Sequence, residues 1–167
     1  PLVTGVTIPA SVILRIVADC PTCVMLKHED WPGLDKITAL RAAPGRRISI
    51  LCGNGGQFLP EEMARGADGA MTGFAYPEMM ARVVADHEAG NRAQAQDIFD
   101  AYLPLVRYEA QPGAGLAVRK HILARRGAIA HATLRKPGGA LNAAGIAEVE
   151  FLIARQEARL AALGLPG

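Results

Sequence analysis

The stretch Cys23-Val-Met-Leu-Lys27-His-Glu-Asp30 decides the fold, because a short apolar run leads directly into a lysine and a group of ionisable residues. The apolar run predicts a buried strand over 23–26, of the near-continuous kind found in parallel sheets. A lysine directly after such a strand lies at the edge where α/β proteins place their functional loops. Alternatively, Lys27 lies just beyond the strand end and extends its amine into solvent. The stretch alone leaves both interpretations open.

Two further short segments predict parallel strands, over 48–52 and 69–73. The first ends abruptly at Gly53-Asn-Gly-Gly56, and the second consists of small residues that permit close approach of a ligand. Helical spacing and helix start signals predict helices over 8–17, 34–40, 59–65 and from Pro77 onward. This alternation of helices and strands is typical of a parallel α/β sheet.

After Gly90 the sequence predicts helices alone. They cover 91–110, 116–126 and 143–163, and we expect Pro104 to bend or split the first of them. We therefore expect residues 1–90 to form an α/β body and residues 91–167 to form a helical extension.

Composition narrows the possible functions. The chain has 167 residues, of which 50% are hydrophobic, and this fits one globular domain. Its net charge is only +2, and no basic tract is interleaved with aromatic residues, so we expect no nucleic-acid partner. No apolar run reaches the ~18 residues of a membrane span, and the N-terminus lacks a secretory signal pattern. We expect a cytoplasmic protein without a membrane partner.

The three cysteines are an odd number, which argues against a disulfide framework. Cys20-Pro-Thr-Cys23 has the spacing of a redox pair, but a thioredoxin-like pair opens a helix after a strand, whereas this pair precedes a strand. A metal site needs more ligands than Cys52 and four scattered histidines offer. We expect all three cysteines to be small, mostly buried residues.

Taken in order, these features resemble the dihydrodipicolinate synthase and N-acetylneuraminate lyase family of pyruvate-type class I aldolases. The matching segments are Val24-Met-Leu-Lys27 with acids after it, Cys52-Gly53, Gly66-Ala-Asp-Gly69-Ala-Met-Thr-Gly73, Tyr76-Pro77, Val118-Arg-Lys-His-Ile-Leu123, Arg126-Gly127 and Arg135-Lys-Pro137. The family's proteins are (β/α)8 barrels with a C-terminal helical extension. The resemblance implies a partial (β/α)8 TIM barrel that carries strands six to eight, and it implies a homo-oligomer, specifically a tetramer.

The resemblance also implies roles for individual residues. Lys27 matches the Schiff-base lysine at the end of the sixth strand. Gly53 matches a glycine whose backbone lies against the bound keto acid, and Met71 matches a position that contacts it through the backbone. The residues themselves agree with the role of Lys27, because an amine beside apolar strands loses solvation of its charged form. This favours the neutral nucleophile that attacks a 2-oxo acid.

The sequence departs from the family pattern just after the lysine. The family has Glu at the next position, whereas His28 stands here before Glu29 and Asp30. Glu29 is our candidate contact to the distal group of the substrate. A solvated acidic loop is the alternative interpretation of Glu29 and Asp30.

Other parts of the family pattern are not found in this sequence. The carboxylate-binding threonines and the proton-relaying tyrosine would precede Pro1, so we expect the sequence to be the C-terminal part of a longer protein. Gly53-Asn-Gly-Gly56 is not a dinucleotide fingerprint, because Phe58 occupies the third glycine position. We expect no cofactor.

The leading functional hypothesis is a Schiff-base lyase that acts on pyruvate or another 2-oxo acid. Its reaction would be aldol cleavage, condensation, or dehydration of a 2-keto-3-deoxy acid. A complete barrel takes about 250 residues, so the second hypothesis is an inactive structural piece with an exposed sheet edge that needs a partner chain. A thiol oxidoreductase that uses Cys20 and Cys23 ranks third.

Overall fold

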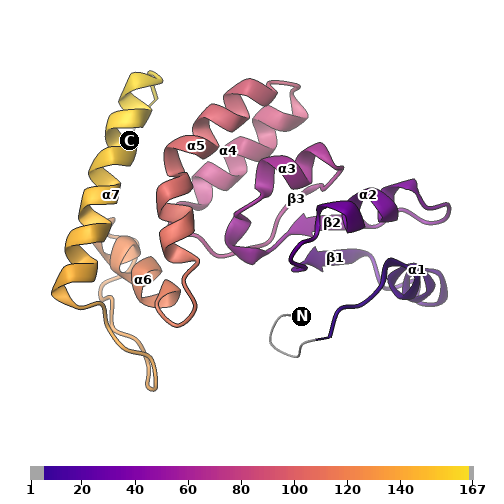
Figure 1. The fold of residues 1–167 in the computed structure, drawn as a ribbon, viewed down its shortest axis with the longest axis horizontal. Coiled ribbons are helices and arrows are strands. Elements are labelled where there is room, and N and C mark those ends of the chain that lie inside the picture. The colour runs from indigo at the N-terminus through magenta and orange to yellow at the C-terminus, as the bar shows by residue number, and fades with distance from the viewer. Residues whose placement is uncertain (1–5, 166–167) are drawn as a thin grey trace.

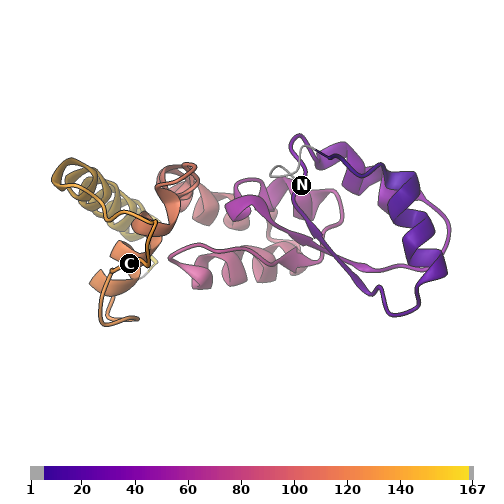
Figure 2. The ribbon, with the colours of Figure 1, turned by 90° about the horizontal axis from the view of Figure 1, so that it is seen from below.

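The structure is a computed structural model, and it describes residues 6–165. Its elements, in chain order, are α1 (Ala10–Asp19), β1 (Met25–His28), α2 (Leu34–Ala42), β2 (Ser49–Cys52), the 3-10 turn η1 (Asn54–Gly56), α3 (Leu59–Ala64), β3 (Gly69–Ala70), α4 (Pro77–Glu88), α5 (Arg92–Glu109), α6 (Gly115–Arg125) and α7 (Ala143–Ala162). Figures 1 and 2 place α1 and α2 at one end of the molecule and α6 and α7 at the other. The predicted change from an α/β part to a helical part is confirmed.

The three strands form one parallel sheet in the order β1-β2-β3. β1 begins two residues later than predicted and contains Lys27 and His28. β3 is only two residues long, but the Met71 N–H donates to the Cys52 carbonyl at 2.9 Å, so hydrogen bonding continues past its end. The predicted parallel α/β pattern is therefore confirmed, with a shorter third strand.

One face of the sheet is covered and the other is open. Ile50 and Cys52 on the covered face are each 1% exposed, whereas Met25 on the opposite face is 42% exposed. Val24, just before β1, is 60% exposed. The prediction that 23–26 is a buried strand is therefore wrong. β1 has a neighbouring strand on one side only, and on its second face Met25 and Lys27 are both exposed. In a closed barrel that face lines the interior.

At the amino-terminal edge of the sheet, Asp68 joins three elements. Its carboxylate accepts the Ile50 N–H at 2.8 Å and pairs with Arg41 of α2 and with Arg47. Burial alone would raise the pKa of Asp68, but the Ile50 N–H and the guanidinium groups of Arg47 and Arg41 outweigh it and hold the pKa below its usual value. Asp68 thus fixes α2, β2 and the entry to β3 together.

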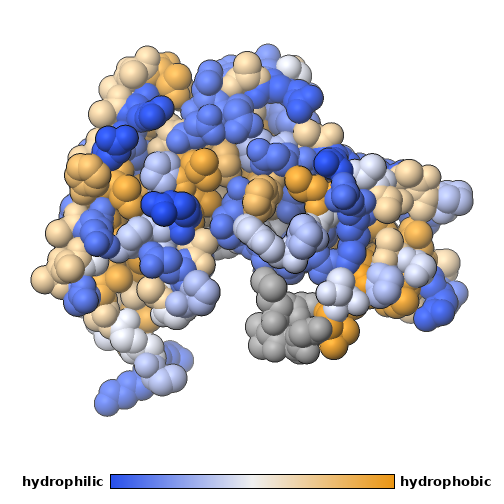
Figure 3. Space-filling model, viewed as in Figure 1, coloured by the Kyte–Doolittle hydropathy of each residue, from blue (hydrophilic) through white to orange (hydrophobic). Residues whose placement is uncertain are grey.

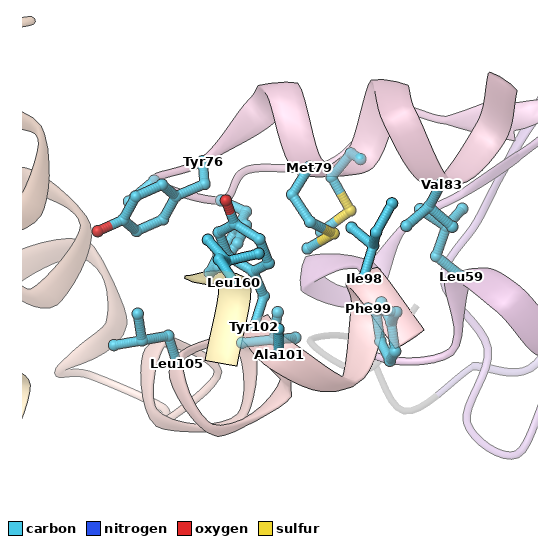
Figure 4. Close-up of a cluster of buried hydrophobic side chains, with 14 of the residues drawn as sticks. Leu59, Tyr76, Met79, Val83, Ile98, Phe99, Ala101, Tyr102, Leu105 and Leu160 are labelled. Atoms are coloured by element: carbon cyan, nitrogen blue, oxygen red, sulfur yellow. The ribbon is translucent and has the colours of Figure 1, made fainter. Parts of the chain in front are cut away.

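The helical part packs onto the α/β part through a single hydrophobic core. In Figure 4, Met79 and Val83 of α4 point toward Ile98 of α5, and Leu59 of α3 lies beside Val83. All four side chains are nearly or fully buried. The core is therefore continuous across residue 90, and the division into two domains there stays a prediction.

α5 runs through Pro104 without interruption, so the expected split of this helix is not observed. Hydrophilic residues cover much of α4 and α5 at the top of the face shown in Figure 3. Among the helices of residues 6–165, none has the length and apolar character needed to cross a membrane.

Candidate active site at the carboxyl edge of the sheet

The carboxyl ends of the three strands bring separate parts of the sequence to one edge. His28 pairs in register with Cys52, and Cys52 pairs with Ala70. The Gly53 N–H then donates to the His28 carbonyl at 2.9 Å. Gly53 and Met71 directly follow β2 and β3, so these two predicted substrate contacts lie at the same edge as Lys27.

Lys27 is the third of the four residues of β1, and its side chain is 46% exposed. It pairs in register with Leu51, which pairs with Gly69. Paired residues of parallel strands point to the same face of the sheet, so the amine lies on the open face in a row with a leucine and a glycine. The predicted position at the carboxyl edge is confirmed. The predicted apolar surroundings of the Lys27 amine are only partly present, because the side chain remains almost half exposed on this face.

The Glu29 carboxylate is held against Lys27. Its Oε1 lies 3.2 Å from Lys27 Nζ, and its Oε2 accepts the Asn54 N–H at 2.9 Å. Asn54 has a left-handed φ of 47°. In the described part of the chain it is the only non-glycine residue with a positive φ. Glu29 is therefore part of the site and not a freely solvated acid. Its predicted contact with the substrate stays a prediction.

Gly53 permits this arrangement because it has no side chain. A Cβ at position 53 would lie 2.5 Å from Glu29 Cδ and 2.5 Å from the His28 carbonyl oxygen. Both separations are far below van der Waals contact. The role that the sequence suggested for Gly53, contact with a bound keto acid, is untested, but its contact with Glu29 is a second reason for a glycine here.

Asp30 is directed away from the lysine. Its carboxylate pairs with Lys36 of α2, and Lys36 Nζ also donates to the Ile8 carbonyl at 2.7 Å. Burial lowers the pKa of the Lys36 amine. Of the two acids that follow His28, only Glu29 contacts the Lys27 amine.

His28 occupies the covered face, opposite Lys27. Its Nδ1 lies 3.3 Å from Glu62 Oε2, at angles that fall short of a hydrogen bond, and both side chains are almost completely buried. A Cβ at Gly33 would fall 2.2 Å from His28 Cε1, so the loop after β1 packs closely on the imidazole. The pairing of His28 with Glu62 was not predicted from the sequence. The alternation of side chains along β1 was the signal, since the residue after an open-face lysine must face the helices.

The three cysteines differ in exposure. Cys52 is buried, and burial, with a contribution from Glu62, raises the pKa of its thiol. Cys20 is exposed, in the turn after α1, so the expectation that all three are mostly buried is wrong for this residue. Cys20 and Cys23 are both free thiols.

The helical part holds the loop that follows β3 and Met71. Arg119 of α6 donates to the Gly73 carbonyl at 2.8 Å and to Glu109 Oε1 at 2.6 Å. Glu109 of α5 in turn accepts the Ala75 N–H at 3.1 Å. Burial raises the pKa of Glu109, against the lowering effect of Arg119. No signal in the sequence indicated this clamp.

No metal site is apparent in the described part of the chain, where no group of three or more His, Cys, Asp or Glu side chains is placed to hold an ion. At this edge the described residues supply an amine, a carboxylate and backbone groups. A lysine amine beside an ionisable partner can act as a nucleophile toward a carbonyl compound.

Comparisons with known proteins show the family and the fold of the chain. The model of the dihydrodipicolinate synthetase family matches residues 1–156. The 4-hydroxy-tetrahydrodipicolinate synthase of Synechococcus sp. (strain CC9605) is 34% identical over 107 residues, which is 62% of this chain and 34% of that protein.

Solved structures extend the comparison. The dihydrodipicolinate synthase from Rhodopseudomonas palustris is 52% identical and superposes with a TM-score of 0.90, over 93% of this chain and 53% of that one. The 4-hydroxy-tetrahydrodipicolinate synthase from Methylacidiphilum fumariolicum SolV, at 23% identity, shares the fold with a TM-score of 0.82 over 96% of this chain and 53% of that one. The chain thus spans about half the length of these solved relatives.

Proposed function

The chain belongs to the dihydrodipicolinate synthetase family, and we propose on that basis that it carries the nucleophile of a Schiff-base lyase. The substrate class is pyruvate or another 2-oxo acid, and the reaction is aldol cleavage, condensation or dehydration next to the former ketone. The observation that carries the proposal is the position of Lys27. Its amine lies at the carboxyl edge of a parallel sheet, on the open face, 3.2 Å from a carboxylate.

The other lysines of the chain support this assignment by contrast. The sequence contains four lysines, Lys27, Lys36, Lys120 and Lys136. Lys36 is paired with Asp30, and Lys120 donates to the Thr133 carbonyl in the helical part. Lys136 is exposed in a turn. Lys27 is the one lysine at the carboxyl edge of the sheet.

The chemistry uses the lysine as a covalent catalyst. The neutral amine attacks the keto carbon, and loss of water leaves an iminium ion that withdraws electrons from the adjacent bond. In the proposed complex the backbones of Gly53 and Met71 contact the keto acid. The absence of a side chain at Gly53 allows the close approach that such a contact needs.

We assign β1, β2 and β3 to strands six to eight of a (β/α)8 barrel. The open sheet face is then the barrel interior, and the rest of the barrel covers it in the protein at its natural length. The assembly as a homo-oligomer, with a tetramer as the expected form, belongs to the same proposal and rests on the family alone.

The test is to trap the imine. The protein at its natural length is incubated with pyruvate and borohydride, and the modified lysine is mapped by mass spectrometry. We expect modification of Lys27, none in Lys27→Arg, and unchanged modification in Lys136→Arg. Modification at another lysine would overturn the assignment. Complete absence of modification would favour the inactive structural piece, and an adduct that is lost in Cys20→Ser would favour a thiol-dependent function.

A further inference from the structure

The segment between β3 and α4 joins the candidate site to the helical part. Under the proposed function, the Met71 backbone at the start of this segment contacts the keto acid. Further along it, Gly73 and Ala75 are both held by side chains of the helical part. We propose that Arg119 and Glu109 are positioning residues, which hold this segment where binding of the 2-oxo acid requires it. This inference rests on the proposed imine chemistry, and it gives the helical part a role in substrate binding.

Two charged side chains fix the backbone of the segment. Arg119 Nη2 donates to the Gly73 carbonyl at 2.8 Å, and its Nε donates to Glu109 Oε1 at 2.6 Å. The other oxygen of Glu109 accepts the Ala75 N–H at 3.1 Å. One guanidinium and one carboxylate therefore hold a carbonyl and an N–H of the same segment.

Burial makes this pair of side chains rigid. The Glu109 side chain is 3% exposed, and that of Arg119 is 32% exposed. A buried carboxylate without a charged partner is costly, so Glu109 holds the guanidinium in place. The guanidinium is planar and presents its donors in a fixed fork. The donor that reaches the Gly73 carbonyl is therefore itself held in one orientation.

Gly73 leaves the space that the guanidinium occupies. A Cβ at position 73 would overlap the Nη1 and Cζ atoms of Arg119. The backbone angles at Gly73 do not call for a glycine, because its φ is not positive. Close contact with Arg119 is therefore the reason that the structure provides for a glycine at this position.

Arg126, just after α6, holds the opposite end of the segment. It donates to the Ala75 carbonyl and pairs with Glu78 in the first turn of α4. This contact does not involve Arg119. Loss of Arg119 therefore releases the end of the segment next to Met71, while the start of α4 stays anchored.

Release of that end has a distinct kinetic consequence. Lys27 lies on β1, which β2 separates from β3, so the amine keeps its place when the segment moves. Binding of the keto acid weakens, whereas attack by the amine on bound keto acid proceeds as before. The half-saturating concentration then rises at an unchanged maximal rate. A general loss of folded protein would instead lower the amount of adduct without a change in half-saturation.

The test measures the initial rate of imine trapping by borohydride at increasing pyruvate concentrations, in the protein at its natural length. Mass spectrometry quantifies the Lys27 adduct. We expect Arg119→Met to raise the half-saturating pyruvate concentration about tenfold at an unchanged maximal rate, because loss of a hydrogen bond to a charged group has an effect of that order. Arg119→Lys, which keeps the charge and a donor, should be intermediate.

Gly73→Ala tests the same contact without a change of Arg119. Its methyl group displaces the guanidinium, so this variant should raise the half-saturating concentration as Arg119→Met does. The double variant should be no worse than either single variant, because both changes remove one contact. Effects that multiply in the double variant would contradict this shared cause.

Arg107→Met is the matched control, because Arg107 is an exposed arginine in the last turn of α5. It should match wild type. An unchanged half-saturating concentration in Arg119→Met, or Arg119→Lys as impaired as Arg119→Met, would overturn the positioning role and leave the imine at Lys27 standing. Failure of the wild-type protein itself to react at Lys27 would overturn the proposed function instead.

Discussion

Gly53 determines how close the Glu29 carboxylate comes to Lys27. The Gly53 backbone lies against Glu29 so closely that a Cβ would be 2.6 Å from Oε1, the oxygen that faces the amine. Even a methyl group must therefore displace the carboxylate or the strand end. The glycine at this position is a requirement of the acid as much as of a bound keto acid.

At this residue scale, we predict that Gly53→Ala slows formation of the Lys27 adduct by about 10²-fold, since a displacement of about 1 Å beside the reacting amine has an effect of that order. Borohydride quenching over time measures the rate. Gly139→Ala is the control, because Gly139 has a negative φ and open space around its Cβ position. An unchanged rate in Gly53→Ala would show that the carboxylate does not need its present position.

At the element scale, the clamp around Asp68 connects the amino-terminal edges of β2 and β3 to α2. The lowered pKa of Asp68 means that the folded protein holds the carboxylate ionised more strongly than the unfolded chain does. Its contribution to stability is therefore present above the ordinary pKa of Asp, about 3.9. It is lost as the pH falls through that value toward the lower folded pKa.

We predict that Asp68→Asn lowers the free energy of unfolding at neutral pH, and that the difference from wild type disappears as the medium is acidified below the folded pKa. Urea unfolding at a series of pH values measures both quantities. Asp97→Asn serves as the control, because Asp97 is an exposed acid on α5, away from the Asp68 clamp. A difference that stays constant across the pH series would mean that the Asp68 charge contributes nothing.

The elements show what the sequence can and cannot predict. Helical spacing and apolar runs located every helix and strand of the α/β part, because those patterns report burial on one face. They misplaced β1 by two residues and treated Val24 and Met25 as buried, because a local pattern does not reveal whether a second layer covers the sheet. The element ends are the least well determined feature of such patterns.

The candidate site was predictable to a similar degree. Lys27 was singled out because it follows an apolar run, whereas Gly53 and Met71 came from the family resemblance alone. The parallel sheet brings all three to one edge. The pairing of Glu29 with Lys27 depends on how the loop folds back onto Gly53, and no sequence spacing encodes that. The link from Arg119 to Gly73 joins residues 46 positions apart and needs the tertiary structure to be seen.

At the scale of the whole molecule, one core connects the sheet-bearing part with the helical part. Ile98 and Phe99 of α5 are 3% and 2% exposed and pack in the same cluster as Leu59 and Val83. Neither part can lose this contact without exposing apolar surface. We therefore expect the described part of the chain to unfold as a unit.

We predict that Ile98→Ala destabilises the protein by about 2–5 kcal/mol, and that fluorescence and circular dichroism report the same unfolding midpoint. The single Trp31 lies in the α/β part, whereas most of the helical residues lie beyond Gly90. Leu116→Ala is the control, because Leu116 is 55% exposed. Two separated midpoints would show that residues 1–90 and 91–167 unfold independently, as separate domains would.

The open sheet face and Lys27 together carry the central claim, which is an imine between this amine and a 2-oxo acid. Its most direct test is a crystal structure of the protein at its natural length after reduction with pyruvate. We predict a covalent bond from Lys27 Nζ to the former keto carbon, with the ligand on the open face beside the backbones of Gly53 and Met71. A free Lys27 in the reduced protein, with pyruvate attached elsewhere or bound on the covered face near His28, would contradict the account.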